Sequence, residues 1–280
     1  MAIIRDNSKH YTYPPELDKF RKLIFCPLDF PEPPEVDEEQ LFKWIKMRAD
    51  KDAGKLAGSV SGATGPIDLD SDKLKRTASY SGKGTYPWRL IHAMRSDFDN
   101  FGWEHWPEFR DMLPELAEYI ESFPVQDFFT ISFLNQKPGI DVGLHTDPDI
   151  FFGLRFYLVN KSKARIFFQK AKEPTTDRLL NIREEVTIGG KNSEPVIKEE
   201  VVNYEWNDIC DSEKIIAKNP TNRYAFHLTG THAAHGVEQV PEDDDTSRVT
   251  AFMVCRVKPK EYAELLERSV EKYKDYAVWW

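Results

Sequence analysis

Short runs of aromatic and β-branched residues fill the second half of this sequence, and they constrain its fold more than any other feature. The runs are DFFTISFL (127–134), FFGLRFYLV (151–159), ARIFFQ (164–169), PVIKEEVVNYEW (195–206), EKIIA (213–217), NRYAFHL (222–228) and SRVTAFMVCRV (247–257). Turn residues separate them, which is typical of a mostly antiparallel β domain. Their number suits a jelly roll, or double-stranded β-helix, a fold that holds ligands in the open end of its barrel.

Helices are expected on either side of this β region. Apolar residues recur at near-helical spacing in DEEQLFKWIKMRAD (37–50), in WPEFRDMLPELAEYIESF (106–123), and in the segment that begins at Pro259. The first 40 residues are rich in proline, which removes backbone donors, so we expect an extended segment there. The predicted fold class is therefore mainly β with flanking helices.

These patterns divide the chain into three parts. Residues 1–124 form an extended and helical region that packs on the barrel and includes a long loop at 54–85. Residues 125–258 form the barrel, with an insertion at about 170–220, and residues 259–280 form a C-terminal helix. The loop is rich in glycine and serine, and both an active-site lid and a surface insertion fit it.

Composition bears mainly on the partners. The 280 residues carry a formal net charge of -9, so the surface as a whole repels phosphate backbones and we expect no nucleic-acid partner. No apolar run is long enough for a membrane helix, and the N-terminus lacks the apolar core of a signal peptide. Cys26, Cys210 and Cys255 form no CxxC pair. We expect packed, reduced thiols and a cytoplasmic protein without a membrane partner.

The stretch GLHTDPD, residues 143–149, has the composition of a metal site. Side chains two positions apart on a strand point to the same face, so His145 and Asp147 can converge on one ion. A polar loop in which Pro148 ends a strand fits the same residues. Asp149 is an alternative to Asp147, although Pro148 interrupts the strand geometry that would bring it to the ion.

A second stretch, THAAHGVEQV (231–240), brings a histidine into the β region and is followed by Arg248. This is the order of the two-histidine, one-carboxylate site, which holds Fe(II) on one face and leaves positions for a bidentate 2-oxo acid and O2. His235 and His232 compete for the role of distal ligand. We favour His235 because it leads directly into an alternating segment.

Arg248 is suited to bind the second, distal carboxylate of a 2-oxo acid such as 2-oxoglutarate, since arginine forms a bidentate, charge-assisted pair that lysine cannot match. Thr250 shares its strand face and has a hydroxyl to donate to the same carboxylate. The alternative for Arg248 is a surface ion pair with the acidic turn at 242–245. On the first β-run, the hydroxyls of Ser132 and Thr130 either reach the co-substrate or form satisfied core hydrogen bonds.

The region from about Phe128 to Val257 resembles the aspartyl/asparaginyl β-hydroxylase-like branch of the 2-oxoglutarate-dependent oxygenases. The matching elements are His145-x-Asp147, LRFYLV (154–159), HGV (235–237) and Arg248 in RVT. The resemblance implies that His145, Asp147 and His235 bind Fe(II), that Arg248 holds 2-oxoglutarate, and that O2 is consumed.

The same resemblance assigns a role to the strand that follows His145-x-Asp147. Arg155 and Tyr157 would contact the co-substrate or the substrate, and they alternate with apolar residues as a barrel-lining strand requires. The chain departs from the family in its spacing, because His235 follows His145 by 90 positions, whereas the family often has a much shorter segment there. Such an insertion is tolerated between strands and often shapes a substrate pocket.

The resulting hypothesis is a dioxygenase that hydroxylates a C–H bond of an amino acid or a related small molecule, with release of succinate and CO2. Asp147 favours hydroxylation over halogenation, while desaturation and ring formation fit the same residues. The alternatives are a protein side-chain hydroxylase and a cupin-like module that binds metal without redox chemistry. A nucleic-acid demethylase is disfavoured by the charge. The oligomeric state is left open.

Overall fold

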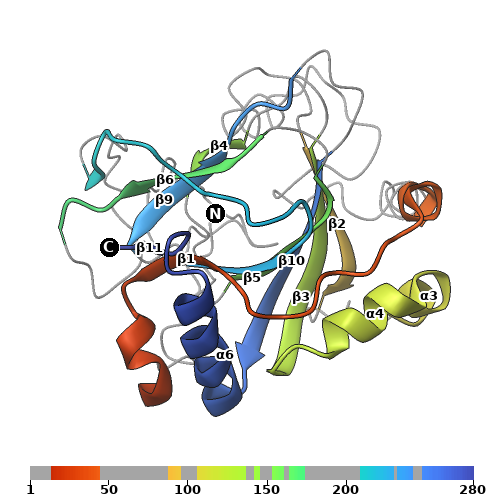
Figure 1. Cartoon of the computed structure of the whole chain (residues 1–280). Helices are drawn as coiled ribbons and strands as arrows, with labels where there is room; N and C mark the ends of the chain where they lie inside the picture. The colour runs from red at the N-terminus through yellow and green to blue at the C-terminus, as the bar shows by residue number, and fades with distance from the viewer. Residues whose placement is uncertain are drawn as a thin grey trace, which may run out of the picture.

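The computed structural model describes residues 14–44, 88–95, 106–136, 142–145, 153–160, 164–173, 209–229, 232–241 and 248–280. Two antiparallel sheets make up its centre (Figure 1). The seven-stranded sheet has the order β11-β1-β8-β5-β10-β3-β2, and the four-stranded sheet has the order β4-β9-β6-β7. The strands are β1 (Leu23–Pro27), β2 (Trp88–Arg95), β3 (Val125–Gln136), β4 (Val142–His145), β5 (Gly153–Asn160), β6 (Ile166–Lys170), β7 (Ile215–Ile216), β8 (Ala225–Leu228), β9 (Ala233–Val237), β10 (Arg248–Val257) and β11 (Val278–Trp279).

The two sheets pack face to face through a shared apolar cluster. Phe25 and Phe226 from the larger sheet meet Phe168 from the smaller one, with ring centroids of Phe25 and Phe168 5.6 Å apart. Val237 of β9 joins the same cluster. This sandwich of antiparallel sheets confirms the predicted mainly β fold with flanking helices and the double-stranded β-helix class.

Helices cover the other face of the seven-stranded sheet (Figure 1). They are η2 (Pro15–Phe20), α3 (Trp106–Met112), α4 (Pro114–Glu121) and α6 (Pro259–Lys272). On β5 the pleat separates the two cores, because Phe156 packs in the helix-side cluster and Tyr157 in the cluster between the sheets. The alternation expected for this strand therefore directs one face to the helices and the other to the barrel interior.

Two short helices stand where one is expected over 106–123. Pro114 has no N–H to donate and would clash with a carbonyl four residues earlier, so α3 ends at Met112 and Pro114 opens α4. Residues 38–44 are helical as expected, and the Asp37 carboxylate caps their first turn by accepting from Glu39 N at 2.9 Å. The remainder of the segment 37–50 lies outside the described residues.

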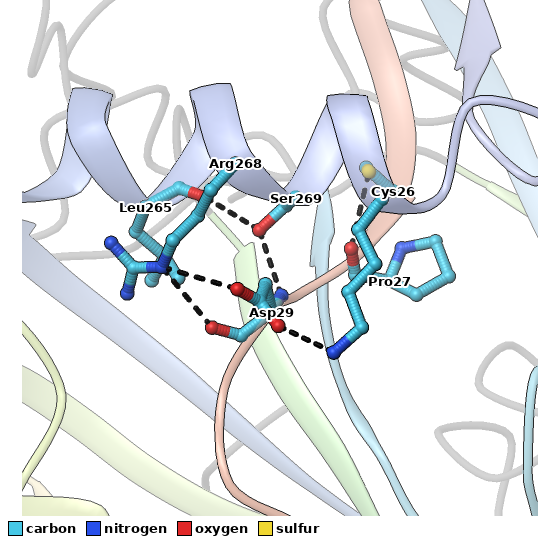
Figure 2. A network of polar contacts seen from close by, with 7 residues as sticks. Cys26, Pro27, Asp29, Leu265, Arg268 and Ser269 are labelled. Atoms are coloured by element: carbon cyan, nitrogen blue, oxygen red, sulfur yellow. Dashed lines mark hydrogen bonds and ion pairs between the residues drawn. The ribbon is translucent and has the colours of Figure 1, made fainter.

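Helix α6 is tied to the chain that leaves β1 by a polar network (Figure 2). Ser269 Oγ accepts from the Asp29 backbone N–H at 2.8 Å and donates to Leu265 O at 2.5 Å. Arg268 and Lys272 add ion pairs to the Asp29 carboxylate. Exposed pairs of this kind stabilise weakly, so the buried Ser269 hydroxyl is the main polar link.

The C-terminal segment 259–280 is not helical throughout. Helix α6 ends at Lys272, and the chain returns as β11 to pair with β1. Strands β1 and β2 come from the expected N-terminal region and also join the seven-stranded sheet, so all three parts contribute to one sheet. The division at 124 and 258 stays a prediction. The expected strand at 195–206 and the loop at 54–85 lie outside the described residues.

All three cysteines are free and buried. Burial raises the pKa of the Cys26 and Cys255 thiols to about 12. They are therefore packed, protonated thiols, in accord with the expectation from their spacing. Among the described residues, no helix is both long enough and apolar enough to cross a membrane.

His227 of β8, which contacts α6, is expected to make the stability of the fold depend on pH. Its Nδ1 lies 2.8 Å from the Tyr262 hydroxyl of α6, and burial lowers its pKa from 6.5 to about 4. The fold thus favours the neutral ring, and this contribution is complete above about pH 6.5 and is lost as the pH falls toward 4. We expect the free energy of unfolding to drop by up to about 3 kcal/mol across that window.

Urea unfolding at a series of pH values checks this expectation. His227→Gln keeps a hydrogen-bonding side chain but does not titrate, so it should flatten the profile between about pH 4 and 6.5. Equal slopes in the two proteins would show that another group controls the acid limb.

Candidate functional site

The two histidine positions of the predicted metal site come together in the smaller sheet. Strand β4 pairs with β9, and the register places His145 opposite His235. Residues opposite each other on antiparallel strands lie on the same face of the sheet. The His145 side chain and Asp147 lie outside the described residues, and no group of three metal-ligating residues occurs within them. The backbone register is thus the observation that bears on the metal site.

His235 lies in the middle of the four-stranded sheet. It is 1% exposed, and β9 runs between β4 and β6. The next residue, Gly236, is where these strands come close, because a Cβ there would lie 2.7 Å from the carbonyl oxygen of Val142 and 2.5 Å from Cζ of Phe167. The absence of a side chain at 236 therefore allows β4 to approach β9 beside His235.

His232 is buried in a different place. Its ring centroid lies 5.7 Å from that of Trp280, and the Arg21 backbone forms a hydrogen bond with it. Burial lowers its pKa. The contacts of His232 are with the C-terminal tail and the segment before β1, whereas His235 is paired with position 145. This arrangement favours His235 as the distal ligand.

Arg248 opens β10 inside the barrel. It is 1% exposed, which argues against the alternative of a surface ion pair. Its Nη1 donates to Gln136 Oε1 at 3.2 Å and its Nη2 donates to the Tyr157 hydroxyl at 3.0 Å. The guanidinium carbon also lies 4.7 Å from the centroid of the Tyr157 ring. Arg248, Gln136, Tyr157 and Thr250 are called the Arg248 cluster below.

Two buried donors of the Arg248 cluster have no hydrogen-bond partner among the described residues. They are Nε of Arg248 and Oγ1 of Thr250, two positions apart on β10. An unmet buried donor costs about 1–3 kcal/mol, so such atoms indicate a missing acceptor. A carboxylate offers acceptors to both. The residues present therefore fit the distal carboxylate of 2-oxoglutarate.

Arg155 lies two positions from Tyr157 on β5 but contacts the other sheet. Its Nη1 lies 3.4 Å from His235 Nε2, and its guanidinium carbon lies 5.3 Å from the Phe252 ring centroid. Tyr157 thus contacts Arg248 in its own sheet, and Arg155 contacts His235 in the other. The strand joins the Arg248 cluster to the proposed metal position.

Ser132 is placed by its backbone alone. In β3 it pairs with Phe252 of β10, which in turn pairs with Arg155 of β5. Its side chain and that of Thr130 lie outside the described side chains. The prediction that these hydroxyls reach the co-substrate stays a prediction.

Gln136 is the member of the Arg248 cluster that sequence reasoning did not identify. It ends β3 and is fully buried, and its Oε1 accepts from Arg248 across 112 positions of sequence. In the sequence it stands in LNQKPG, where a glutamine before a turn is unremarkable. The pairing of β3 with β10 is the information that brings it to the site.

Comparison with known proteins gives weak likenesses. No protein-family model and no curated protein matched the chain. Among solved structures, a prolyl-4-hydroxylase from Pseudomonas putida has 9% identity and a TM-score of 0.38, with 86% of this chain and 96% of that chain covered. A prolyl hydroxylase from Trichoplax adhaerens, in complex with a hypoxia inducible factor peptide, has 7% identity and a TM-score of 0.35, covering 88% and 90%.

A carbocyclase of nogalamycin biosynthesis, described as a non-heme alpha ketoglutarate dependent enzyme, has 10% identity and a TM-score of 0.38, covering 93% of this chain and 92% of that one. Because these identities and TM-scores are low, the function of this chain is argued from its strand topology and from the residues of the site.

Gly236→Ala tests the close approach of β4 and β9. The added Cβ would contact a backbone carbonyl, so the strands must separate at His235. We expect destabilisation of about 1–3 kcal/mol and iron binding weakened by at least about tenfold, as for loss of a supporting contact around a metal. Thermal melting and iron content after desalting give the two readouts.

Val237→Ala is the matched control on the same strand. It removes buried apolar volume without forcing the strands apart, so it should lower the melting temperature and leave iron content near that of the wild type. Full iron binding by Gly236→Ala would contradict the role given to this approach.

Proposed function

We propose that this protein is an Fe(II)- and 2-oxoglutarate-dependent dioxygenase. His145, Asp147 and His235 would hold the iron, and Arg248 would anchor 2-oxoglutarate. The observation that carries the proposal is the pair of buried donors on Arg248 and Thr250 that have no acceptor among the described residues, in the sheet opposite the pairing of position 145 with His235. A site that holds both a metal position and a carboxylate anchor is what a chelating 2-oxo diacid requires.

When bound, the iron, 2-oxoglutarate and O2 supply the oxidation, in which one oxygen atom enters a substrate C–H bond and the other enters succinate as CO2 leaves. The protein's own residues bind and orient 2-oxoglutarate. Arg248 and Thr250 donate to the distal carboxylate, and Tyr157 holds the Arg248 guanidinium by its hydroxyl. The aromatic cluster between the sheets excludes water around these donors, which strengthens the ion pair.

The proposed substrate is an amino acid or an amino-acid-derived small molecule. Arg155 supports this, because its half-buried guanidinium lies beside His235, where it can pair with a substrate carboxylate through two parallel hydrogen bonds. A protein side-chain hydroxylase is the alternative within the same reaction class. The proposed location is the cytoplasm, in keeping with three free, buried cysteines.

Succinate release from 2-oxoglutarate, measured over a panel of free amino acids, their carboxamides and short peptides, tests this function. We expect at least one free amino acid to stimulate release and its carboxamide to stimulate far less. Arg155→Met should raise the KM for that amino acid and leave the Kd for 2-oxoglutarate unchanged. Stimulation by peptides alone would favour the side-chain hydroxylase. Metal binding without affinity for 2-oxoglutarate would refute the dioxygenase and support the cupin-like metal-binding module.

A further inference from the structure

Two hydrogen bonds fix the orientation of the Gln136 amide. Its Nε2 donates to the carbonyl oxygen of Glu238 at 3.1 Å, and its Oε1 accepts from Arg248 Nη1 at 3.2 Å. A carbonyl only accepts and a guanidinium only donates, so the reversed amide would lose both contacts. Gln136 thereby connects β10 of the seven-stranded sheet to the segment that leaves β9 of the four-stranded sheet.

The acceptor for Gln136 is itself held firmly. The Glu238 backbone N–H donates to Arg165 O at 2.9 Å. The Glu238 carboxylate accepts from Arg165 Nε at 2.8 Å and from Nη2 at 2.9 Å. These hydrogen bonds from Arg165 lower the pKa of the Glu238 carboxyl. Since Glu238 follows His235 by three positions, the carbonyl that holds Gln136 is fixed relative to the proposed metal strand.

We infer that Gln136 is a positioning residue, which holds Arg248 for the distal carboxylate of the 2-oxo acid and sets its place relative to the strand of His235. The inference rests on the proposed function. An arginine side chain has many rotamers, and ordering it in advance removes an entropic cost from ligand binding. Gln136 fixes Nη1 and Tyr157 fixes Nη2, so Nε is left for the ligand.

The Gln136 amide also carries no charge. Among the described residues, the side chains that hydrogen-bond to Arg248 are those of Gln136 and Tyr157, and neither is a carboxylate. They orient the guanidinium without neutralising it, so the bound carboxylate meets a full positive charge. A glutamate at position 136 would pair with Arg248 and compete with the ligand.

The test compares 2-oxoglutarate with pyruvate, a 2-oxo acid that lacks the distal carboxylate. Both are titrated calorimetrically into the full-length protein loaded with Mn(II). Wild type should prefer 2-oxoglutarate by at least about 100-fold, as expected for a desolvated charge pair. Gln136→Glu should weaken 2-oxoglutarate binding by about 100-fold, and Gln136→Met by about tenfold. Pyruvate and Mn(II) should bind each variant as they bind wild type.

Gln169→Glu is the matched control. Gln169 is also a buried glutamine that donates to a backbone carbonyl, that of Ser212 at 3.2 Å, and it lies on β6 of the four-stranded sheet, whereas Arg248 lies on β10 of the seven-stranded sheet. The same introduced charge at 169 should leave the preference for 2-oxoglutarate over pyruvate unchanged. If Gln136→Glu does not fold, Gln136→Met carries the comparison.

The outcomes separate this inference from the proposed function. If wild type prefers 2-oxoglutarate but both Gln136 variants keep that preference, Gln136 has no positioning role and the inference is overturned. It is also overturned if 2-oxoglutarate, pyruvate and Mn(II) all weaken together, since this is the signature of a structural defect. If wild type binds neither 2-oxo acid, the proposed function is refuted, and the inference that rests on it falls with it.

Discussion

Arg248→Met is expected to abolish useful binding of 2-oxoglutarate while leaving the protein folded. Truncating one member of a buried, hydrogen-bonded charge pair costs about 3 kcal/mol or more, which corresponds to at least about 100-fold in Kd. Arg248 supplies the charge of the Arg248 cluster, and its Nε has no acceptor among the described residues. Removal of a buried charge by an apolar side chain of similar length does not require loss of folding stability.

The measurement is calorimetric titration of 2-oxoglutarate and pyruvate into Mn(II)-loaded protein. Pyruvate binding should be unchanged in Arg248→Met, because pyruvate has no distal carboxylate. Arg248→Lys should recover only part of the affinity, since lysine keeps the charge but cannot reproduce the planar fork that meets Tyr157 and Gln136 together. Unaltered 2-oxoglutarate binding in Arg248→Met would refute the assigned anchor.

His235→Ala is expected to lose iron, and His232→Ala is expected to retain it. The loss should exceed the about 10- to 100-fold that follows from removing an outer partner of a metal ligand, since a ligand itself is removed. The reason is the register of β9, which pairs His235 with position 145, whereas His232 packs on Trp280.

Iron content after anaerobic loading and desalting, with melting temperature as the folding control, decides between the two histidines. Both residues are buried, so both variants are expected to lose some stability, and iron per folded protein is the informative quantity. Equal retention by the two variants would refute the choice of His235.

In the proposed site, the two sheets carry different tasks. Strands β3, β5 and β10 of the seven-stranded sheet carry the Arg248 cluster, while β4 and β9 of the four-stranded sheet carry positions 145 and 235. Arg155 and Gln136 reach from the first sheet to the second, to His235 and to the Glu238 carbonyl. Substitutions in the Arg248 cluster are therefore expected to act on 2-oxoglutarate affinity, and those at His235 and Gly236 on metal affinity.

Periodicity was enough to predict the strand that lines the barrel. Leu154, Phe156 and Leu158 alternate with Arg155 and Tyr157, and the structure places the first set on the helix-side core. Strand β1, LIFCP, was not predicted as a strand because all five residues are buried, so it shows no alternation, and because the prolines around it indicated only extended chain.

For the helix expected over 106–123, periodicity predicted too much: the structure has two short helices there instead of one. Its apolar stripe is continuous in the sequence, and the stripe outweighed Pro114, which in the structure separates α3 from α4. The local rule for proline was sufficient to predict the break. Periodicity reports which face is buried, and here both short helices bury that face, so the stripe alone cannot reveal an interruption.

Of the Arg248 cluster, Arg248, Thr250 and Tyr157 were predicted from the sequence, since charge, strand spacing and the family pattern indicate them. Gln136 could not be predicted, because its contact with Arg248 depends on the register of β3 against β10. His235 was preferred over His232 from the sequence alone, and the separate packing of the two residues adds support that the sequence does not contain.

Anaerobic addition of Fe(II) and then 2-oxoglutarate to the protein tests the central claim most directly. A 2-oxo acid chelated to Fe(II) gives a weak visible charge-transfer band, and our account predicts this band in wild type and its loss in His145→Ala. Correctly folded wild-type protein that binds Fe(II) and shows no band with 2-oxoglutarate would contradict the account.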